Sequence, residues 1–140
     1  MSSAPQKPDN TLRMVLQSSF SELEAAIDKT QGFFSEIVDD EEFLYKIVLL
    51  ASEAMTNAME HGNGLDASKN VTVDLVEKSD SLEIWVEDEG DGFDRTSVAD
   101  PLADEHLLDE GGRGLFLIEQ LADDVRYELN GRRLGILFRK

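Results

Sequence analysis

The sequence predicts an α+β fold, a two-layer α/β sandwich in which a mixed, mostly antiparallel sheet carries its helices on one face. Two patterns predict it. In some segments apolar and polar residues alternate, as in half-buried strands, and in others apolar residues recur at helical spacing. These segments follow one another as strand, two helices, two strands, helix and two strands. A chain of 140 residues can bury one core, so we expect a single domain over residues 11–140.

The chain begins with a segment that does not fit either pattern. Residues 1–10 contain two prolines and no apolar run, which predicts a flexible arm that is neither signal peptide nor membrane anchor. The alternation of Leu12, Met14 and Leu16 then predicts a strand within residues 11–20.

Two helices are expected next. Ser21, with Glu24 at the capping-box position, is predicted to begin a helix that runs to about residue 37. The second helix is predicted from about residue 39 to the stop signal Gly62-Asn63-Gly64.

The rest of the chain supplies four strands and one helix. Alternation over residues 71–75 and 82–86 predicts an antiparallel hairpin, on which Trp85 faces away from the apolar residues as a partner contact or a partly covered surface residue. A long acidic, glycine-rich loop follows, and such a loop in a compact domain is usually functional. Helical spacing from Gly114 and strands near 125–129 and 134–138 complete the fold.

The charge of the chain limits its partners. Thirty acidic residues against thirteen basic ones give a formal net charge of −17, which repels nucleic acid phosphates and an anionic membrane surface. The absence of cysteine removes disulfides, thiolate catalysis and thiolate metal sites. No apolar run is long enough to cross a bilayer. We therefore expect a cytoplasmic protein that binds neither nucleic acid nor membrane and whose acidic surface suits a basic partner.

The second predicted helix carries a polar stripe. Glu53, Asn57 and His61 stand four residues apart on a helix that is apolar on most other sides, so the stripe is expected to face a pocket. The Asn57 amide oxygen suits a hard cation such as Mg²⁺, and the Glu53 carboxylate could accept a proton from a hydroxyl that attacks phosphorus. The alternative is a hydrogen-bonded pair that joins two helices, and this helix taken alone favours it.

The hairpin ends in an acidic, glycine-rich segment, Asp-Glu-Gly-Asp-Gly-Phe. Counting by twos from Leu82 places Asp88 on the apolar face of its strand, so its carboxylate is expected to point inward where the strand ends. Gly90 and Gly92 would let the backbone approach a bound molecule, and a buried carboxylate suits an amine donor such as that of adenine. Taken alone, the segment is also typical of an acidic turn, and the acidic spacing of a calcium loop is not met.

A glycine cluster, Gly-Gly-Arg-Gly at 111–114, runs directly into the last helix. Free N–H groups at a helix start, together with the helix dipole, attract an anion by roughly 0.3–1 kcal/mol. Arg113 would add a positive charge there. The cluster is neither a P-loop nor a dinucleotide fingerprint. A lid hinge is the alternative, and it explains the glycines but not the other two groups of residues.

Together these three motifs resemble the GHKL (Bergerat-fold) class of ATP-binding domains. The closer resemblance is to the anti-sigma-factor serine/threonine kinases of bacterial partner-switching systems. The motifs are Ser-Glu-Ala-Met-Thr-Asn-Ala-Met-Glu-His-Gly (52–62), Asp-Glu-Gly-Asp-Gly-Phe (88–93) and Gly-Gly-Arg-Gly-Leu-Phe-Leu-Ile (111–118). They stand in the family's order and approximate spacing, and the resemblance extends from about residue 11 to the end. It implies ATP and Mg²⁺ as cofactors.

The resemblance implies a role for each matching residue. Asn57 would ligate Mg²⁺, Glu53 would be the general base for a serine hydroxyl, and Asp88 would bind the adenine amine. Gly90 and Gly92 would shape the adenine pocket, and residues 94–110 would form the ATP lid. The phosphate side of the site would be formed by Gly111, Gly112, Arg113, Gly114 and Leu115.

The resemblance also implies an activity and partners. Such proteins are typically homodimers that bind a sigma factor in one state, and in the other bind and phosphorylate a serine of an anti-sigma-factor antagonist. One alternative is an ATP-dependent regulator that binds a partner without phosphate transfer. Many relatives carry a Thr in the last strands that supports the adenine contact, and the lack of Ser and Thr in residues 131–140 keeps this alternative open. A second alternative is an acidic interaction protein that binds no nucleotide.

Overall fold

A single five-stranded sheet forms one layer of the protein. The computed structural model describes residues 10–90 and 110–140, except for the side chains of residues 110–113. The strands lie in the order β1-β2-β3-β5-β4, and every pairing between them is antiparallel. Their bounds are β1 Asn10–Gln17, β2 Asn70–Glu77, β3 Ser81–Glu87, β4 Asp124–Glu128 and β5 Arg133–Arg139.

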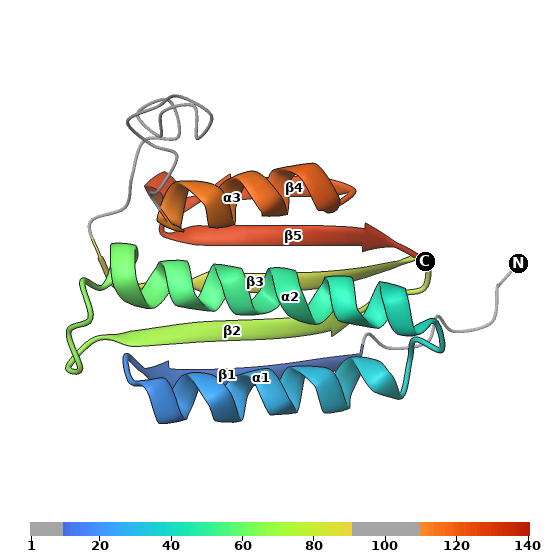
Figure 1. Cartoon of the computed structure of the whole chain (residues 1–140), viewed down its shortest axis with the longest axis horizontal. Coiled ribbons are helices and arrows are strands. Elements are labelled where there is room, and N and C mark those ends of the chain that lie inside the picture. Colours follow the sequence, from blue (N-terminus) through green and yellow to red (C-terminus); the bar gives the residue numbers. More distant parts are fainter. Residues whose placement is uncertain (1–9, 91–109) are drawn as a thin grey trace, which may run out of the picture.

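Three helices form the second layer. The helices α1 (Phe20–Ser35), α2 (Glu41–Asn57) and α3 (Glu110–Leu121) lie on the same face of the sheet (Figure 1). The predicted two-layer α+β fold is therefore confirmed, with a sheet that is antiparallel throughout the described strands. None of the described helices is long and apolar enough to span a membrane.

The core lies between the two layers, where the alternation along the strands directs apolar side chains. Leu82, Ile84 and Val86 of β3 are at most 2% exposed. The helices contribute apolar side chains that are fully buried against the sheet, among them Phe34, Ile47, Leu50, Met55 and Ile118. The strand pattern in the sequence thus sets which face of the sheet the helices cover.

The first two helices begin at capping residues. Ser19 caps α1, because its hydroxyl accepts a hydrogen bond from Glu22 N, and the Glu22 carboxylate accepts one from Gln17 N. The predicted cap at Ser21 with Glu24 is therefore wrong by two residues. Asp40 caps α2 by accepting hydrogen bonds from the second and third backbone N–H groups of that helix.

Two helix boundaries near the predicted site differ from the expectation. The α-helical part of α2 ends at Asn57 and continues as a π-helix, η1 (Ala58–Gly62), which widens the last turn. The helix α3 begins at Glu110 rather than at Gly114, so Gly111 and Gly112 belong to its first turn.

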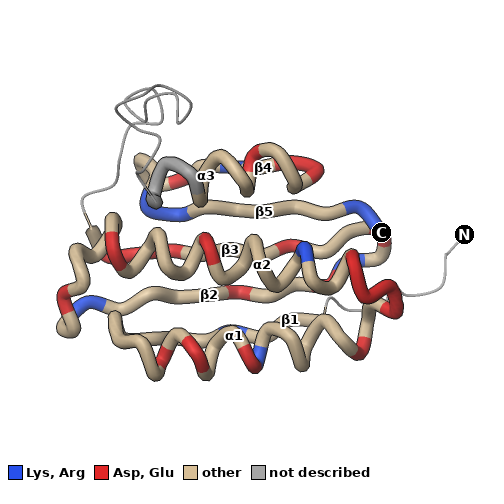
Figure 2. Tube along the Cα trace, in the orientation of Figure 1, with Lys and Arg blue, Asp and Glu red and all other residues tan. Residues whose placement is uncertain are grey.

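The face of the sheet opposite the helices is covered by its own polar and aromatic side chains. The Trp85 ring lies against Gly135, where a methyl group would come within 2.4 Å of the indole. The Arg133 guanidinium lies 4.7 Å from the centre of that ring, and Trp85 Nε1 donates a 2.9 Å hydrogen bond to Glu83. Basic residues stand at both ends of β5, whereas acidic residues are spread over the helices and turns (Figure 2). Trp85 is 9% exposed, so it is buried on this face of the sheet and is not the partly covered surface residue that was one of the two predictions.

Candidate functional site

The predicted site residues within the described part of the chain gather at one end of the sheet. The end of α2, the end of β3 and the first turn of α3 all lie at the left-hand end of Figure 1. Because β1 and β2 are antiparallel, Gln17 at the end of β1 pairs with Asn70 at this same end. Residues from three separate sequence motifs can therefore act on one bound molecule.

The polar stripe of α2 faces the start of α3. Glu53 and Asn57 are both half-buried, one helical turn apart. A methyl group at Gly114 would lie 3.0 Å from Glu53 Oε2, so the carboxylate is in close contact with the backbone of α3. His61 does not continue the stripe as predicted, because it lies in the π-helix; its side chain is exposed and 3.9 Å from Glu60 Oε2.

Asp88 points inward at the end of β3, as the alternation predicts. It is 6% exposed, and its backbone N–H donates to Arg132 O over 2.9 Å. Gly90 N donates a 2.8 Å hydrogen bond to Asp88 Oδ1, and this is the only hydrogen bond to the Asp88 side chain from the described residues. Burial raises the pKa of Asp88, and the Gly90 N–H and the positive charge of Arg132 oppose that rise.

The backbone of two glycines lies close to the carboxylate of Asp88. A methyl group at Gly62 would lie 2.2 Å from Asp88 Oδ2, and one at Gly90 would lie 1.8 Å from Gly62 O. These two glycines therefore allow the end of η1 and the segment after β3 to pack directly onto Asp88. Gly92, the other glycine predicted for this pocket, lies outside the described residues.

The first turn of α3 lies across from the α2 stripe. The first four N–H groups of a helix have no partner within it, and in α3 these belong to residues 110–113. Gly114 is buried against Glu53, and the Leu115 side chain is 7% exposed and belongs to the hydrophobic core. The predicted lid, 94–110, lies outside the described residues except for Glu110.

Two residues at this end, Gly62 and Asn63, are predicted from the sequence only as part of a helix stop. Gly62 contacts the Asp88 carboxylate, and Asn63 is 3% exposed, with its side chain bonded to Asn70 O and Glu89 N. In the sequence they form part of a Gly-Asn-Gly segment that is typical of a helix stop. An asparagine between two glycines is the feature of the sequence that could have indicated this role. The sequence does not show its partners, because Asn70 and Glu89 lie 7 and 26 residues further along the chain.

The residues around Asp88 and Glu53 do not by themselves form a metal cage. Among the described residues, no group of three or more His, Cys, Asp or Glu side chains is placed to hold a metal ion. Asn57 is the predicted ligand, and Mg²⁺ commonly binds through one or two protein groups together with phosphate oxygens and water. The donor set therefore fits a magnesium ion that arrives with a phosphate-bearing ligand.

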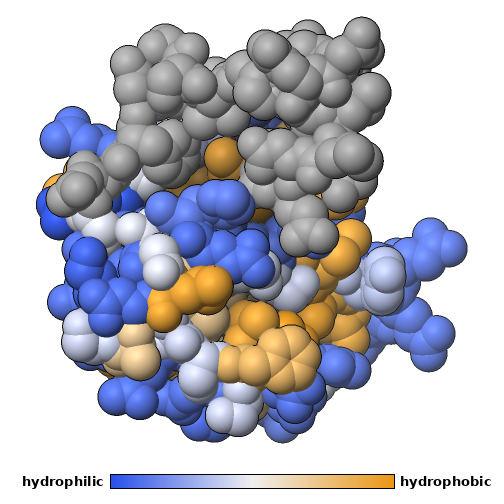
Figure 3. All heavy atoms as spheres, turned by 60° about the vertical axis from the view of Figure 1, so that its left-hand side comes forward, coloured by the Kyte–Doolittle hydropathy of each residue, from blue (hydrophilic) through white to orange (hydrophobic). Residues whose placement is uncertain are grey.

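Apolar side chains are exposed at the end of the molecule that carries this site. Figure 3 turns this end forward and shows apolar surface among hydrophilic residues. Phe20, at the start of α1, is 74% exposed, and Leu65, just after η1, is 62% exposed.

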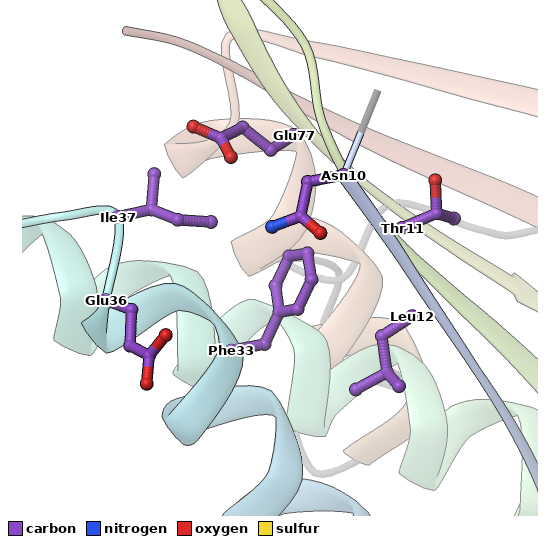
Figure 4. Close-up of a pocket in the computed structure, with 7 residues that line it drawn as sticks. All are labelled: Asn10, Thr11, Leu12, Phe33, Glu36, Ile37 and Glu77. Carbon is purple, nitrogen blue, oxygen red and sulfur yellow. The ribbon is translucent and has the colours of Figure 1, made fainter. Parts of the chain in front are cut away.

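A separate pocket lies at the opposite end of the sheet. It has a volume of about 530 Å³ and is formed where β1 begins and where α1 and β2 end (Figure 4). Its lining residues are Asn10, Thr11, Leu12, Phe33, Glu36, Ile37 and Glu77. None of them is a predicted site residue, so the pocket does not belong to the group around Asp88.

Comparisons with known proteins show to which family the chain is similar. The family described as histidine kinase-like ATPase domain matches residues 16–140. The serine-protein kinase RsbW of Bacillus licheniformis is 32% identical over 135 residues, which cover 91% of this chain and 76% of that protein. RsbW of Bacillus subtilis is 38% identical over 86 residues, covering 57% of this chain and 54% of that protein. RsbW of Oceanobacillus iheyensis is 32% identical over 108 residues, covering 73% and 65%.

Proposed function

The chain belongs to the family of histidine kinase-like ATPase domains, and from this premise we propose that it is a Mg·ATP-dependent protein serine kinase that also acts as an anti-sigma factor. Its substrate would be a serine of an anti-sigma-factor antagonist. Its similarity to serine-protein kinases named RsbW supports the kinase activity. The matched segments span 76%, 54% and 65% of these relatives, so the activity of the whole relative is part of the proposal.

The nucleotide would bind across the end of the sheet, with its base at Asp88 and its phosphates at α3. Asp88 Oδ2 accepts no hydrogen bond from the described residues, which suits an acceptor for the adenine amine. The N–H groups in the first turn of α3, with Arg113, would bind phosphate oxygens. Asn57 would offer its amide oxygen to Mg²⁺, which neutralises phosphate charge when bound.

Glu53 would act as the general base of phosphate transfer. The serine oxygen attacks the γ-phosphorus and forms the new P–O bond, the bond from the γ-phosphorus to the bridging oxygen breaks, and ADP leaves. The hydroxyl proton goes to the Glu53 carboxylate. The single observation that carries the proposal is the contact of Glu53 with Gly114, because it places a carboxylate directly beside the helix start predicted to hold the phosphates.

Charge and exposed apolar surface support a protein partner. The formal net charge of −17 disfavours binding to nucleic acid or an anionic membrane, so we place the protein in the cytoplasm. Phe20 and Leu65 expose apolar surface at the end that carries the site, where a protein substrate has to present its serine. We propose a homodimer in which the nucleotide state decides whether the sigma factor or the antagonist is held.

The direct test is transfer of labelled phosphate from ATP to the cognate antagonist, recovered from the native cell on the immobilised chain. Wild-type protein is expected to label a serine, and Glu53→Gln to lower the rate by at least about 100-fold while ATP still binds. Glu60→Gln is the matched control, because Glu60 is exposed, lies two helical turns on, and should transfer at the wild-type rate.

The other outcomes separate the alternatives. Transfer that survives Glu53→Gln unchanged removes Glu53 from the mechanism. Tight ATP binding by the wild-type protein without transfer to any recovered partner favours the ATP-dependent binding regulator. No effect of ATP and Mg²⁺ on the melting temperature would contradict nucleotide binding itself.

A further inference from the structure

A closed ring of hydrogen bonds includes Glu89, the residue that follows Asp88. Asn63 Nδ2 donates to Asn70 O over 3.0 Å, and Glu89 N donates to Asn63 Oδ1 over 2.8 Å. The ring is closed by Asn70 N, which donates to the Glu89 carboxylate. It joins the end of η1, the start of β2 and the residue that follows Asp88.

Asn63 is the only member of the ring that is buried, and its backbone is bonded as well. Asn63 N donates to Ala58 O over 2.8 Å, and Asn63 O accepts from Asp66 N over 3.1 Å. Both backbone groups and both ends of the side-chain amide therefore have partners. A side chain at 3% exposure with four such bonds is held in one position.

The Asn63 side chain makes both bonds because its amide carries a donor and an acceptor. A backbone carbonyl such as Asn70 O can only accept, and a backbone N–H such as Glu89 N can only donate, so the orientation of the Asn63 amide is determined. An aspartate of the same shape would turn a carboxylate oxygen toward Asn70 O. Serine is too short to reach both partners.

Asn63 is joined to both segments that contact the Asp88 carboxylate. Gly62 precedes Asn63 and lies against Asp88 Oδ2, where even a methyl group would be only 2.2 Å away. Glu89 follows Asp88, and Gly90 N binds Asp88 Oδ1. The ring thus holds both pieces of backbone that enclose the carboxylate.

We propose that Asn63 is a positioning residue that sets the base specificity of the nucleotide site, by holding Gly62 and the Glu89–Gly90 segment around Asp88. The inference rests on the proposed function, in which Asp88 binds the adenine amine. Guanine presents an oxygen at the corresponding position, and an acceptor held firmly there rejects it. A carboxylate that is free to move would accept both bases more equally.

The test measures the dissociation constants of the full-length chain for Mg·ATP and Mg·GTP by isothermal titration. Asn63→Asp is expected to weaken ATP binding roughly tenfold, equivalent to the loss of about one hydrogen bond, and to lower the preference for ATP over GTP by a similar factor. Glu89→Ala removes an exposed member of the ring, so it should fold normally and lower the preference by roughly threefold. If Asn63→Asp does not fold, the ATP-to-GTP preference of Glu89→Ala alone tests the positioning role.

Thr30→Val is the matched control for a purely structural effect. Thr30 is fully buried in α1, and its hydroxyl donates a 2.7 Å hydrogen bond to Ala26 O, away from the site. This variant should lower the melting temperature and leave the ATP-to-GTP ratio unchanged. If Glu89→Ala and every folded Asn63 variant also keep the wild-type ratio, the positioning role is wrong.

A variant of Asp88 separates this inference from the proposed function. Asp88→Asn should abolish ATP binding, because its amide would turn a donor toward the adenine amine. If it binds ATP as the wild type does, base recognition by Asp88 fails. If it loses ATP while the ring variants keep the ratio, only the role of Asn63 fails.

Discussion

Replacing Gly62 by alanine tests whether the Asp88 carboxylate depends on the close approach of η1. The added methyl group would lie 2.2 Å from Asp88 Oδ2, 2.3 Å from its Cγ and 2.8 Å from its Cβ. Nonbonded carbon atoms prefer a separation of about 3.5–4.0 Å, so the carboxylate or the turn has to move by about 1 Å. Gly62 does not have a positive φ, so the effect is steric and not conformational.

Two effects of this clash can be estimated. Forcing an extra methyl group into a packed position costs about 1–3 kcal/mol of unfolding free energy. A displacement of about 1 Å in a site group lowers function by roughly 100-fold. We therefore expect Gly62→Ala to lose ATP affinity far beyond its loss of stability, as measured by ATP titration and by urea unfolding of the nucleotide-free protein.

Two other glycines are controls for this experiment. Gly32, inside α1, has nothing within 4 Å of an added methyl group, so Gly32→Ala should stabilise the protein by about 0.5–1 kcal/mol. Gly64 also has open space around it but has a φ of +60°, so Gly64→Ala should destabilise by about 1–2 kcal/mol through the backbone. Both should keep wild-type ATP affinity. The reasoning fails if Gly62→Ala binds ATP as tightly as the wild type, or if Gly64→Ala loses ATP equally.

Three further variants test other parts of the structure. Burial raises the pKa of Asp88, so its ionisation destabilises the folded state as pH rises through that raised pKa. Asp88→Asn should therefore raise the melting temperature of the nucleotide-free protein at pH 7. In acid, where Asp88 is protonated, the two melting temperatures should no longer differ in this way. A melting temperature below that of the wild type at pH 7 would contradict this. Gly114→Ala brings a methyl group to 3.0 Å from Glu53 Oε2. The rate of phosphate transfer should fall by about tenfold or more, while the affinity for ADP should change less. Equal losses of transfer rate and ADP affinity would argue against Glu53 as the base. Gly135→Ala should displace the ring of Trp85, the only tryptophan, and shift its fluorescence to the red; an unchanged spectrum would show that the ring does not rest on Gly135.

Local rules in the sequence were enough to orient the main carboxylates. The two-residue period of β3 alone turns Asp88 toward the core. Leu82, Ile84 and Val86 belong to the core cluster and Trp85 does not, which confirms that β3 keeps this period. Helical spacing alone places Glu53 and Asn57 on one stripe. Both rules depend only on neighbours within the same element, so they hold before the fold is known.

Boundaries were harder to predict because neighbouring elements decide them. Several serines compete for the cap of α1, and the pairing of β1 with β2 ends at Gln17, which brings the turn early enough for Ser19 to cap. The glycines in the first turn of α3 have low helix propensity, yet the helix includes them because it packs on α2. The π-helix after Asn57 has no periodic signal in the sequence, and it moves His61 off the stripe.

The role of Asn63 could not be predicted because its partners are far along the chain. Its side chain bonds Asn70, 7 residues away, and Glu89, 26 residues away, and the bond to Glu89 forms only once β2 and β3 have paired. The segment Gly-Asn-Gly looks the same in the sequence whether it only ends a helix or also provides a buried asparagine that joins a ring of hydrogen bonds. Only the three-dimensional arrangement separates them.

The glycines at this site serve the carboxylates of the protein itself. Gly62 lies against Asp88, Gly90 lies against Gly62 and binds Asp88 Oδ1, and Gly114 lies against Glu53. The carboxylates of Asp88 and Glu53, which are predicted to bind adenine and to act as the base, therefore pack against glycine backbone. A Cβ at any of these glycines would disturb that packing. From the sequence, Gly90 and Gly114 were expected to make room for a nucleotide, but the contacts in the folded chain already require them. A substitution at any of these three positions therefore disturbs a carboxylate before any ligand binds, so ligand-free measurements on the glycine variants can detect the change directly.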